Sequence, residues 1–437
     1  MDATIAPLDL ARSGCQAVSP DGERYTTPTG VPGDRVRLEP LPVRGRVARL
    51  VRVLKPSPDR VQAPCAVLDR CGGCSFQSMA YPRQLEAKEA SMRRVLANLL
   101  DGARVSPVTG LERPFGYRTR LMMPATPQGR GFQLGFYQRG STALVEATGC
   151  PVQHPLTLAT LAMAQQTLLA AQIEATAPRR DGGWLHGLAI RADPTSGMSE
   201  LTLIGRTPKL PGGQPLAEQL AALPGVAGVH LSVSPERSSY LLGDRFEHLA
   251  GHRRTIFHLA GEAFHLSPGS FFQTCAEGAE RLAEIVLDML PASFDALADL
   301  YGGVGVFARL SRGRWGKAIV AESNPHAIED LRSWLRVSGE QGIEVVSGGV
   351  EEVIGRVMKR SPDVVLLDPP RSGCRPEVIA SLGHRRPSVI VYVACGIEAL
   401  AWDGAALLKA GYRVERIASV DMFPHTPHLE VVARFVV

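Results

Sequence analysis

The residues best suited to chemistry are cysteines that gather in one short stretch of the chain. Cys65, Cys71 and Cys74 lie in CAVLDRCGGC, and Cys150 follows far downstream in TGCPVQHP. Four thiolates can ligate a cubane iron–sulfur cluster or a structural zinc ion. The glycines before the last cysteine of the trio offer backbone amides to sulfur rather than bulk to a core. The C-x5-C-x2-C spacing therefore predicts a metal centre, and residue type alone leaves iron–sulfur and zinc open.

A second group of candidates follows strand-like segments in the C-terminal part. The glycine loop DLYGGVGVF begins at Asp299, and Glu322 ends the next strand-like segment, AIVAES. Glycines let a backbone approach a nucleotide-like ligand closely, and an acid at the next strand end can accept both ribose hydroxyls. Asp368 ends a further segment in LLDPP, where capping a helix is its alternative role. Together these residues predict a nucleotide cofactor site.

One cysteine and one acid near the end of the chain are candidates for catalysis. Cys395 ends VYVACG beside Gly396 and an expected helix start, a position that lowers a thiol's pKa and exposes it to ligand. Most single cysteines in such strands only pack in a core. Glu430 lies on the last strand-like segment, in HTPHLE, where a salt bridge is its alternative role.

One reaction would use the nucleotide cofactor site, Cys395 and Glu430 together. The C5 carbon of a pyrimidine is a poor nucleophile, so a thiolate must first add at C6, giving an enolate-like carbanion that attacks the sulfonium methyl of S-adenosylmethionine. We expect Cys395 to supply that thiolate. A base must then remove the C5 proton so that the adduct can collapse, and Glu430 is the candidate base.

Three regions of different character must position these residues. Residues 1–60 show short strands between turns and predict a small β-barrel, with a basic strand in RGRVARLVRVLKP that suits a phosphate backbone or simply guards a sheet edge. Residues 61–264 predict a helix at 81–100 and then a β-rich domain with a helix at 156–173. Residues 265–437 alternate strand and helix patterns, which predicts a doubly wound, mostly parallel α/β sheet ending in an antiparallel hairpin.

Bulk composition narrows the class of protein. The 437 residues are 21% charged and 45% hydrophobic, with a mean hydropathy of +0.00, which predicts a globular, multidomain protein that needs no membrane. The net charge of +5 is compatible with a polyanionic partner but decides little alone. The opening MDATIAPLDLARSG has no basic-then-apolar leader, so we expect a cytoplasmic protein with reduced thiols.

Seven motifs stand in an order that resembles the RNA 5-methyluridine (pyrimidine C5) methyltransferase family over nearly the whole chain: CAVLDRCGGC, TGCP, LSPGSFFQ, DLYGGVG, LLDPPRSG, YVACG and MFPHTPHLE. The resemblance implies a Rossmann-like class I S-adenosylmethionine methyltransferase domain. It also implies an OB-like TRAM barrel that binds RNA at the N-terminus and a β-rich central domain with an iron–sulfur cluster.

The resemblance assigns a role to each candidate residue. It implies that the four cysteines named above hold a 4Fe-4S cluster rather than zinc. It implies cofactor contacts from Gln273, Tyr301, Glu322 and Asp368, a nucleophilic Cys395 and a basic Glu430. The implied partner is RNA, ribosomal RNA in preference to transfer RNA, with no obligate protein partner.

The nucleophile loop departs from the family pattern. Where Ser-Cys-Asn-Pro is expected, the chain has Ala394, Cys395, Gly396 and Ile397. Polar groups beside the target base are lost, and thiolate addition serves both pyrimidines, so C5 methylation of cytidine is kept as an alternative. An RNA-binding iron–sulfur protein without catalysis is the nonenzymatic alternative, which a failed methyl-transfer assay with bound cofactor would support.

Overall fold

The chain divides into two compact units. The computed structural model describes residues 1–7, 15–41, 46–176, 183–234 and 241–437. The first unit contains Met1–Pro64, Cys74–Glu112 and Glu277–Val437, and the second contains Cys65–Gly73 and Arg113–Ala276. The predicted three-domain boundaries, after residues 60 and 264, stay a prediction.

The first unit begins with a five-stranded antiparallel sheet. Its strands run in the order β3-β2-β1-β4-β5, and their bounds are β1 (Asp2–Ile5), β2 (Cys15–Val18), β3 (Arg24–Thr27), β4 (Arg35–Pro40) and β5 (Ala48–Lys55). A bridge between Thr26 and Val47 joins the two edges, so the sheet curls into the small barrel that the sequence predicted. Alternation along β4 turns Val36 and Leu38 into its core. The basic segment RGRVARLVRVLKP lies partly on β5, where Arg49, Arg52 and Lys55 are exposed. Its Arg44 lies outside the described residues.

An eight-stranded sheet forms the rest of the first unit. The strand order is β19-β18-β17-β20-β21-β23-β22-β6. The bounds are β6 (Arg104–Thr109), β17 (Phe294–Leu300), β18 (Trp315–Glu322), β19 (Ile343–Ser347), β20 (Val364–Leu367), β21 (Val389–Ala394), β22 (Arg413–Val420) and β23 (Glu430–Val436). The first five strands in this order are parallel, and β22 and β23 form the predicted antiparallel hairpin.

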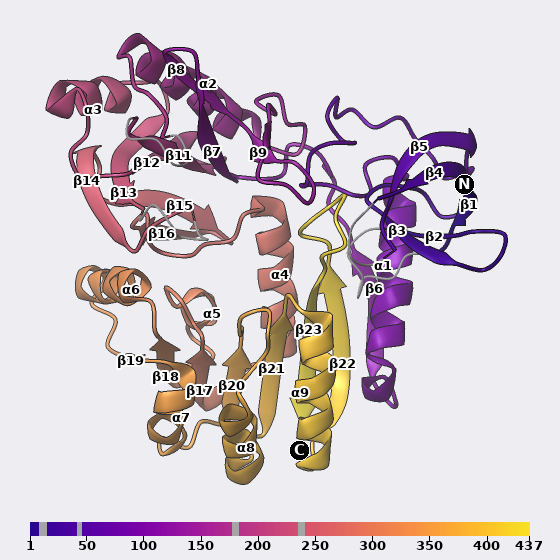
Figure 1. Ribbon diagram of the computed structural model, residues 1–437. Helices are drawn as coiled ribbons and strands as arrows, with labels where there is room; N and C mark the ends of the chain where they lie inside the picture. The colour runs from indigo at the N-terminus through magenta and orange to yellow at the C-terminus, as the bar shows by residue number, and fades with distance from the viewer. Residues whose placement is uncertain (8–14, 42–45, 177–182, 235–240) are drawn as a thin grey trace. The chain divides into compact units, whose positions relative to one another are not determined.

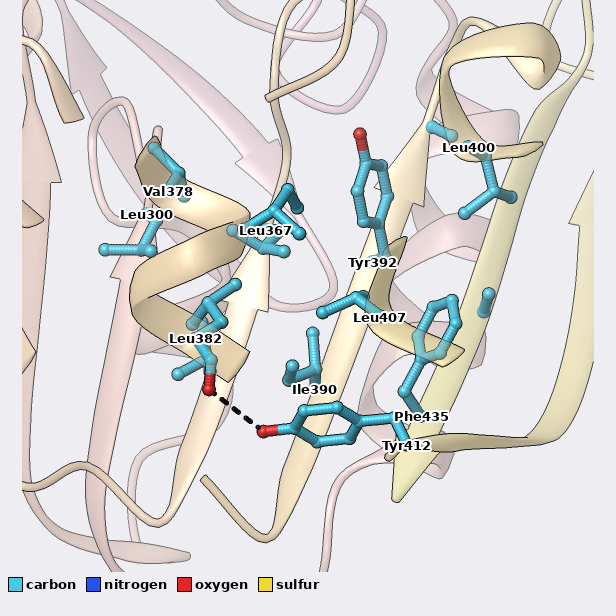
Figure 2. Packing of buried hydrophobic residues seen from close by; sticks show 14 of the residues in the cluster. Leu300, Leu367, Val378, Leu382, Ile390, Tyr392, Leu400, Leu407, Tyr412 and Phe435 are labelled. Atoms are coloured by element: carbon cyan, nitrogen blue, oxygen red, sulfur yellow. Dashed lines mark hydrogen bonds between the residues drawn. The ribbon is translucent and has the colours of Figure 1, made fainter. Parts of the chain in front are cut away.

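Helices cover both faces of this eight-stranded sheet, which is called the catalytic sheet below because the predicted catalytic residues lie on it (Figure 1). Their bounds are α1 (Tyr81–Val95), α4 (Ala276–Met289), α5 (Val306–Leu310), α6 (Pro325–Ser338), α7 (Val350–Met358), α8 (Pro376–Arg385) and α9 (Ile397–Lys409). One continuous apolar core joins α1, α7, α8 and α9 to one face. Figure 2 shows Leu382 and Leu407 packed over Ile390, with the Tyr412 hydroxyl directed at the Leu382 carbonyl. Helices α5 and α6 contact β17 and β18 from the opposite face.

Residues 74–112 join the catalytic sheet, although the sequence prediction assigned them to the central domain. The predicted helix at 81–100 is found as α1 followed by a short 3-10 turn at Ala97–Leu99. Strand β6 was not predicted. It pairs in parallel with β22 at the sheet edge, where a short strand with Pro107 is tolerated because no further strand needs its donors.

The second unit is built on a six-stranded sheet in the order β14-β13-β12-β11-β7-β8. The bounds are β7 (Arg120–Gln128), β8 (Gly131–Leu134), β11 (Leu185–Asp193), β12 (Met198–Gly205), β13 (Val226–Val233) and β14 (Arg245–Gly251). Helices α2 (Pro155–Ala170) and α3 (Gly213–Ala221) pack on it around one apolar core. Two small hairpins complete the unit, β9 (Phe136–Tyr137) with β10 (Leu144–Val145), and β15 (Thr255–Leu259) with β16 (Glu262–Leu266). None of the helices that the structure describes is long and apolar enough to cross a membrane.

Candidate active site

Five predicted site residues lie at one edge of the catalytic sheet. Tyr301 follows β17, Glu322 ends β18, Asp368 follows β20 and Cys395 follows β21. These four strands are parallel neighbours, so their carboxyl ends meet where open α/β sheets bind ligands. Glu430 reaches the same edge from the other direction, because it begins β23, which runs antiparallel to β21.

The strand register sets Cys395 opposite Glu430. Ala394 on β21 pairs with Val431 on β23. In antiparallel register the next residue after Ala394 therefore faces the residue before Val431. The negative charge of Glu430 also raises the pKa of the Cys395 thiol, as expected for neighbouring side chains. The structure thus brings together the two residues that the sequence proposed for catalysis.

Acidic side chains crowd this edge of the sheet. Burial raises the pKa of Asp299 to about 7, and the charges of Asp368 and Glu322 act in the same direction. Burial likewise raises the pKa of Asp368 to about 7 and that of Glu430 to about 8, each with a neighbouring carboxylate adding to the effect. Because these acids disfavour one another's ionised forms, the site favours a ligand that brings positive charge.

The thiol of Cys395 differs from the sequence prediction. A position between a strand end and a helix start predicted a lowered pKa, but burial raises the pKa of Cys395 to about 11, and the charges of Glu430 and Asp368 add to this shift. Only Arg371, among the named charges, acts in the opposite direction. Desolvation and two carboxylates outweigh the helix end, so the free thiol stays protonated at neutral pH.

The glycine loop after β17 is shaped by its contacts with Glu322. The amide of Gly303 donates a hydrogen bond of 2.8 Å to Glu322 Oε2, and Ser323 and Asn324 donate to Oε1 at 2.7 Å each. Tyr301 has a φ of +60°, a left-handed conformation that is uncommon outside glycine. A side chain added at Gly303 would meet nothing within 4 Å, so the loop leaves open space beside Glu322.

Asp299 is a site residue that the sequence prediction did not select. It lies near the end of β17, on the face opposite its neighbours Ala298 and Leu300, which belong to the core with α7 and α8. Its Oδ2 accepts a hydrogen bond of 3.1 Å from the Ala308 amide, and within the described part of the chain Oδ1 has no hydrogen-bond partner. Its place at the start of DLYGG was the available clue.

A close backbone approach explains the unusual glycine in the nucleophile loop. A Cβ placed on Gly396 would lie 2.4 Å from the carbonyl oxygen of Arg371. The φ of Gly396 is −120°, which any residue adopts, so space and not backbone conformation requires glycine here. The loop that carries Arg371 therefore lies directly against the nucleophile loop.

The loop after Asp368 is held by a polar contact behind the site. Asp403 on α9 accepts hydrogen bonds from the Cys374 amide at 2.8 Å and from the Tyr392 hydroxyl at 2.6 Å. Tyr392 is on β21, three residues before Cys395, and its side chain is fully buried. One carboxylate thus ties the loop after β20 and the strand that carries Cys395 at its end to the same helix.

None of the four cysteines proposed for the metal centre, all of which the structure describes, is in a disulfide. Cys65, Cys71 and Cys150 belong to the second unit, and Cys74 begins a segment of the first. Burial raises the pKa of Cys65 and of Cys150, and the charge of Cys71 acts on both in the same direction. The amide of Gly73 lies 3.4 Å from Cys71 Sγ, as the prediction of amide donors to sulfur required. In the parts of the chain described, no group of three or more Cys, His, Asp or Glu side chains has the geometry to hold a metal ion.

Gln273 is the remaining predicted site residue. It belongs to the second unit, beyond the β15–β16 hairpin. It stays a predicted cofactor contact, whereas the other predicted cofactor residues belong to the first unit.

Comparison with known proteins identifies the family. Residues 356–434 match the family model described as tRNA (uracil-5-)-methyltransferase. An uncharacterized RNA methyltransferase of Nostoc sp. is 35% identical over 98% of this chain and 95% of its own length. One from Gloeobacter violaceus is 33% identical over 94% of this chain and 91% of its own. The chain belongs to the family of these RNA methyltransferases, and its residues 356–434 match the uracil-5 model.

A solved structure extends this result to the whole fold. The Pyrococcus abyssi tRNA (uracil-54, C5)-methyltransferase in complex with S-adenosyl-L-homocysteine matches this RNA methyltransferase with a TM-score of 0.80 and 26% identity, over 100% of both chains. The predictions of the family, of an S-adenosylmethionine-dependent RNA C5 methyltransferase and of a Rossmann-like catalytic fold are confirmed. The family match at 356–434 includes Asp368, Cys395 and Glu430.

Proposed function

We propose that this RNA methyltransferase modifies C5 of a uridine through a covalent bond between Cys395 and C6. The observation that carries the proposal is the register of β21 and β23, which sets Glu430 opposite Cys395. A nucleophile and a base on adjacent strand ends can act on neighbouring carbons of one pyrimidine ring, as adduct formation and release require.

Cys395 starts the reaction as a nucleophile. Its thiol, with a pKa of about 11 in the free site, must first give its proton to water. The positive charge of Arg371 favours the thiolate. As the S–C6 bond forms, the electron pair of the C5–C6 double bond makes C5 nucleophilic. Bound S-adenosylmethionine supplies the electrophilic methyl group.

Glu430 ends the reaction as a base. It takes the C5 proton, the electrons of that C–H bond restore the C5–C6 double bond, and the S–C6 bond breaks to return the thiolate. A pKa of about 8 makes Glu430 a stronger base than an ordinary carboxylate, yet still half ionised near that pH. Burial beside Asp368 therefore suits the residue to this step.

For the cofactor we propose contacts from Tyr301, Glu322 and Asp368 at the strand ends and from Gln273. Two features of the described residues fit a nucleoside with a positive sulfonium. The glycine loop leaves open space at Gly303 beside Glu322. The buried carboxyl of Asp368 has its pKa raised by the burial and by the charge of Glu322, and a positive charge nearby would favour its ionised form. Glu322 Oε1 accepts from the Ser323 amide, the Ser323 hydroxyl and the Asn324 amide, whereas Oε2 accepts from the Gly303 amide and keeps a lone pair for a ribose hydroxyl.

We further propose that Cys65, Cys71, Cys74 and Cys150 ligate a 4Fe-4S cluster. The charges of Cys65 and Cys71 act on the pKa of Cys150, so these three side chains are neighbours, and the Gly73 amide lies beside Cys71 Sγ; both observations support a shared site. Protein purified without oxygen should be brown and should lose its visible absorbance when Cys71 is replaced. A colourless protein that carries zinc would overturn the cluster.

Ribosomal RNA, 23S in particular, is the substrate that we propose, with transfer RNA as the competitor. The ribosomal proposal rests on the N-terminal barrel together with the cysteine motif, an arrangement that resembles the ribosomal members of the family, whereas the Pyrococcus abyssi relative is named for transfer RNA. Nucleoside mass spectrometry after incubation of each RNA with labelled S-adenosylmethionine distinguishes them. Label in transfer RNA alone would reject the ribosomal substrate, and no label in either RNA would favour the binding-only alternative.

Cytidine is a second candidate base because of one observation. Gly396 replaces a polar family residue and packs against the Arg371 carbonyl, so the group beside the target base differs from the family pattern. The same mass spectrometry decides, since labelled 5-methylcytidine in place of 5-methyluridine would identify the altered base.

A further inference from the structure

The segment that delivers Glu430 to the active site is held by a distant helix. Residues 421–429 connect β22 to β23, and Glu430 is the first residue of β23. Several of the bonds that fix this connection come from side chains of α1, more than 300 residues earlier in the chain.

Lys88 binds both ends of this segment. Its side chain is fully buried, and its Nζ donates to Asp421 Oδ1 at 2.6 Å, to the Phe423 carbonyl at 3.1 Å and to the His428 carbonyl at 2.8 Å. An ammonium group has three N–H donors, so every donor is used. The last of these contacts is two residues from Glu430.

Gln84 fixes the middle of the segment. Its Oε1 accepts a hydrogen bond of 2.9 Å from the His425 amide, while its Nε2 donates to the carbonyls of Phe76 and Met79. His425 has a φ of +66°, a conformation that a residue with a side chain adopts only when its surroundings impose it. The amides of Ser75 and Phe76 donate to the His425 carbonyl and complete the hold.

Packing alone does not explain this arrangement. Gln84 and Lys88 are one helical turn apart on the buried face of α1, where leucine or methionine would fill space without desolvating a charge. A buried ion pair such as Lys88–Asp421 is weak evidence for stability but fixes geometry, because its donors and acceptors must meet in one arrangement. The ion pair therefore fixes the path of the segment that leads into Glu430.

We propose that Lys88 and Gln84 are positioning residues that hold Glu430 at the distance and angle needed to take the C5 proton. This inference rests on the proposed function and deepens it. The surroundings of Cys395 are held by other contacts, since Gly396 lies against the Arg371 carbonyl and Asp403 binds Tyr392 on the same strand, so loss of the α1 contacts should leave adduct formation intact. The step that slows is proton removal with release of the S–C6 bond.

The test uses the full-length protein, RNA that it methylates, and S-adenosylmethionine with a labelled methyl group. Lys88→Met keeps an unbranched side chain that is one atom shorter and removes its donors. We expect turnover to fall about 10- to 100-fold, because a small misplacement of a catalytic group costs about that much. We also expect labelled protein–RNA adduct that survives denaturation to accumulate, as it should in Glu430→Gln.

Controls separate positioning from folding. Arg94→Met removes an exposed charge from the same helix and should leave turnover and adduct unchanged. Gln84→Leu is the milder variant, and it decides the outcome if Lys88→Met fails to fold as judged by circular dichroism and cofactor binding. A folded Lys88→Met or Gln84→Leu protein with normal turnover, or one that loses turnover and adduct together, would overturn the positioning role.

The same experiment keeps this inference distinct from the proposed function. Glu430→Gln that releases product normally, or adduct that persists in Cys395→Ala, would reject the assigned nucleophile and base. If both reference variants behave as expected, the result for Lys88 and Gln84 tests their role alone.

Discussion

The two sides of the active site are held in different ways. On the nucleophile side, Gly396 lies against the Arg371 carbonyl and Asp403 ties Cys374 to Tyr392, all within one stretch of the chain after β20. On the base side, the approach to Glu430 is fixed by Lys88 and Gln84 on α1. Local contacts thus surround the proposed nucleophile, whereas the segment that carries the proposed base depends on a helix far away in sequence.

The largest effect should follow from removing the nucleophile. Cys395→Ala should abolish turnover, because every later step needs the S–C6 bond. Cofactor binding, measured by calorimetry, should stay near normal. Cys15→Ala, in the distant barrel core, is the matched control and should stay active. Full activity of Cys395→Ala would reject the covalent mechanism, and the contacts around Cys395 and Glu430 could then no longer be assigned to a nucleophile and a base.

The pH dependence of adduct release should report the base side, because Cys395 has already reacted at that point. Glu430 must be ionised to take a proton, and its pKa is about 8, so the rate of product release from preformed adduct should fall about tenfold for each pH unit below that value. Glu430→Asp should move the profile, whereas Tyr392→Phe should not. A flat profile between about pH 6 and 8 would argue against Glu430 as the base.

The same shift has a consequence for stability. The pKa of Glu430 is raised from 4.5 in an unfolded chain to about 8, so the folded state binds its proton more tightly. Stability from this group is therefore fully present below about pH 4.5 and is lost as pH rises through about 8. Glu430→Gln removes this loss, and its melting temperature should exceed that of the wild type most clearly above about pH 8.

A smaller effect should come from crowding the nucleophile side. Gly396→Ala places a Cβ 2.4 Å from the Arg371 carbonyl, so one of the two loops must move. We expect a loss of about 1–3 kcal/mol in the free energy of unfolding and a lower rate of adduct formation, without adduct accumulation. Gly303→Ala, where a Cβ meets open space but the φ is +57°, separates crowding from backbone strain. Unchanged stability of Gly396→Ala would mean that the loops are not in close contact.

The smallest effect should come from Tyr392→Phe. The change removes one hydrogen bond to Asp403 and leaves the bond from the Cys374 amide in place. Chemical denaturation should show a loss of about 1–2 kcal/mol, with little change in turnover. A large drop in turnover would mean that the buried polar contact acts directly on the nucleophile loop.

The sequence by itself determined the α/β class of the C-terminal region, the closing hairpin and the candidates at the strand ends, because apolar periodicity and glycine motifs are local properties of the chain. Only the tertiary structure decided that β6 joins the catalytic sheet and that the pKa of Cys395 is raised, since strand pairing, desolvation and neighbouring charges depend on segments far apart. Lys88 shows the limit most clearly. A lysine on a helix predicts a solvated side chain, and its buried contacts with the Glu430 segment arise only when two distant parts of the chain meet.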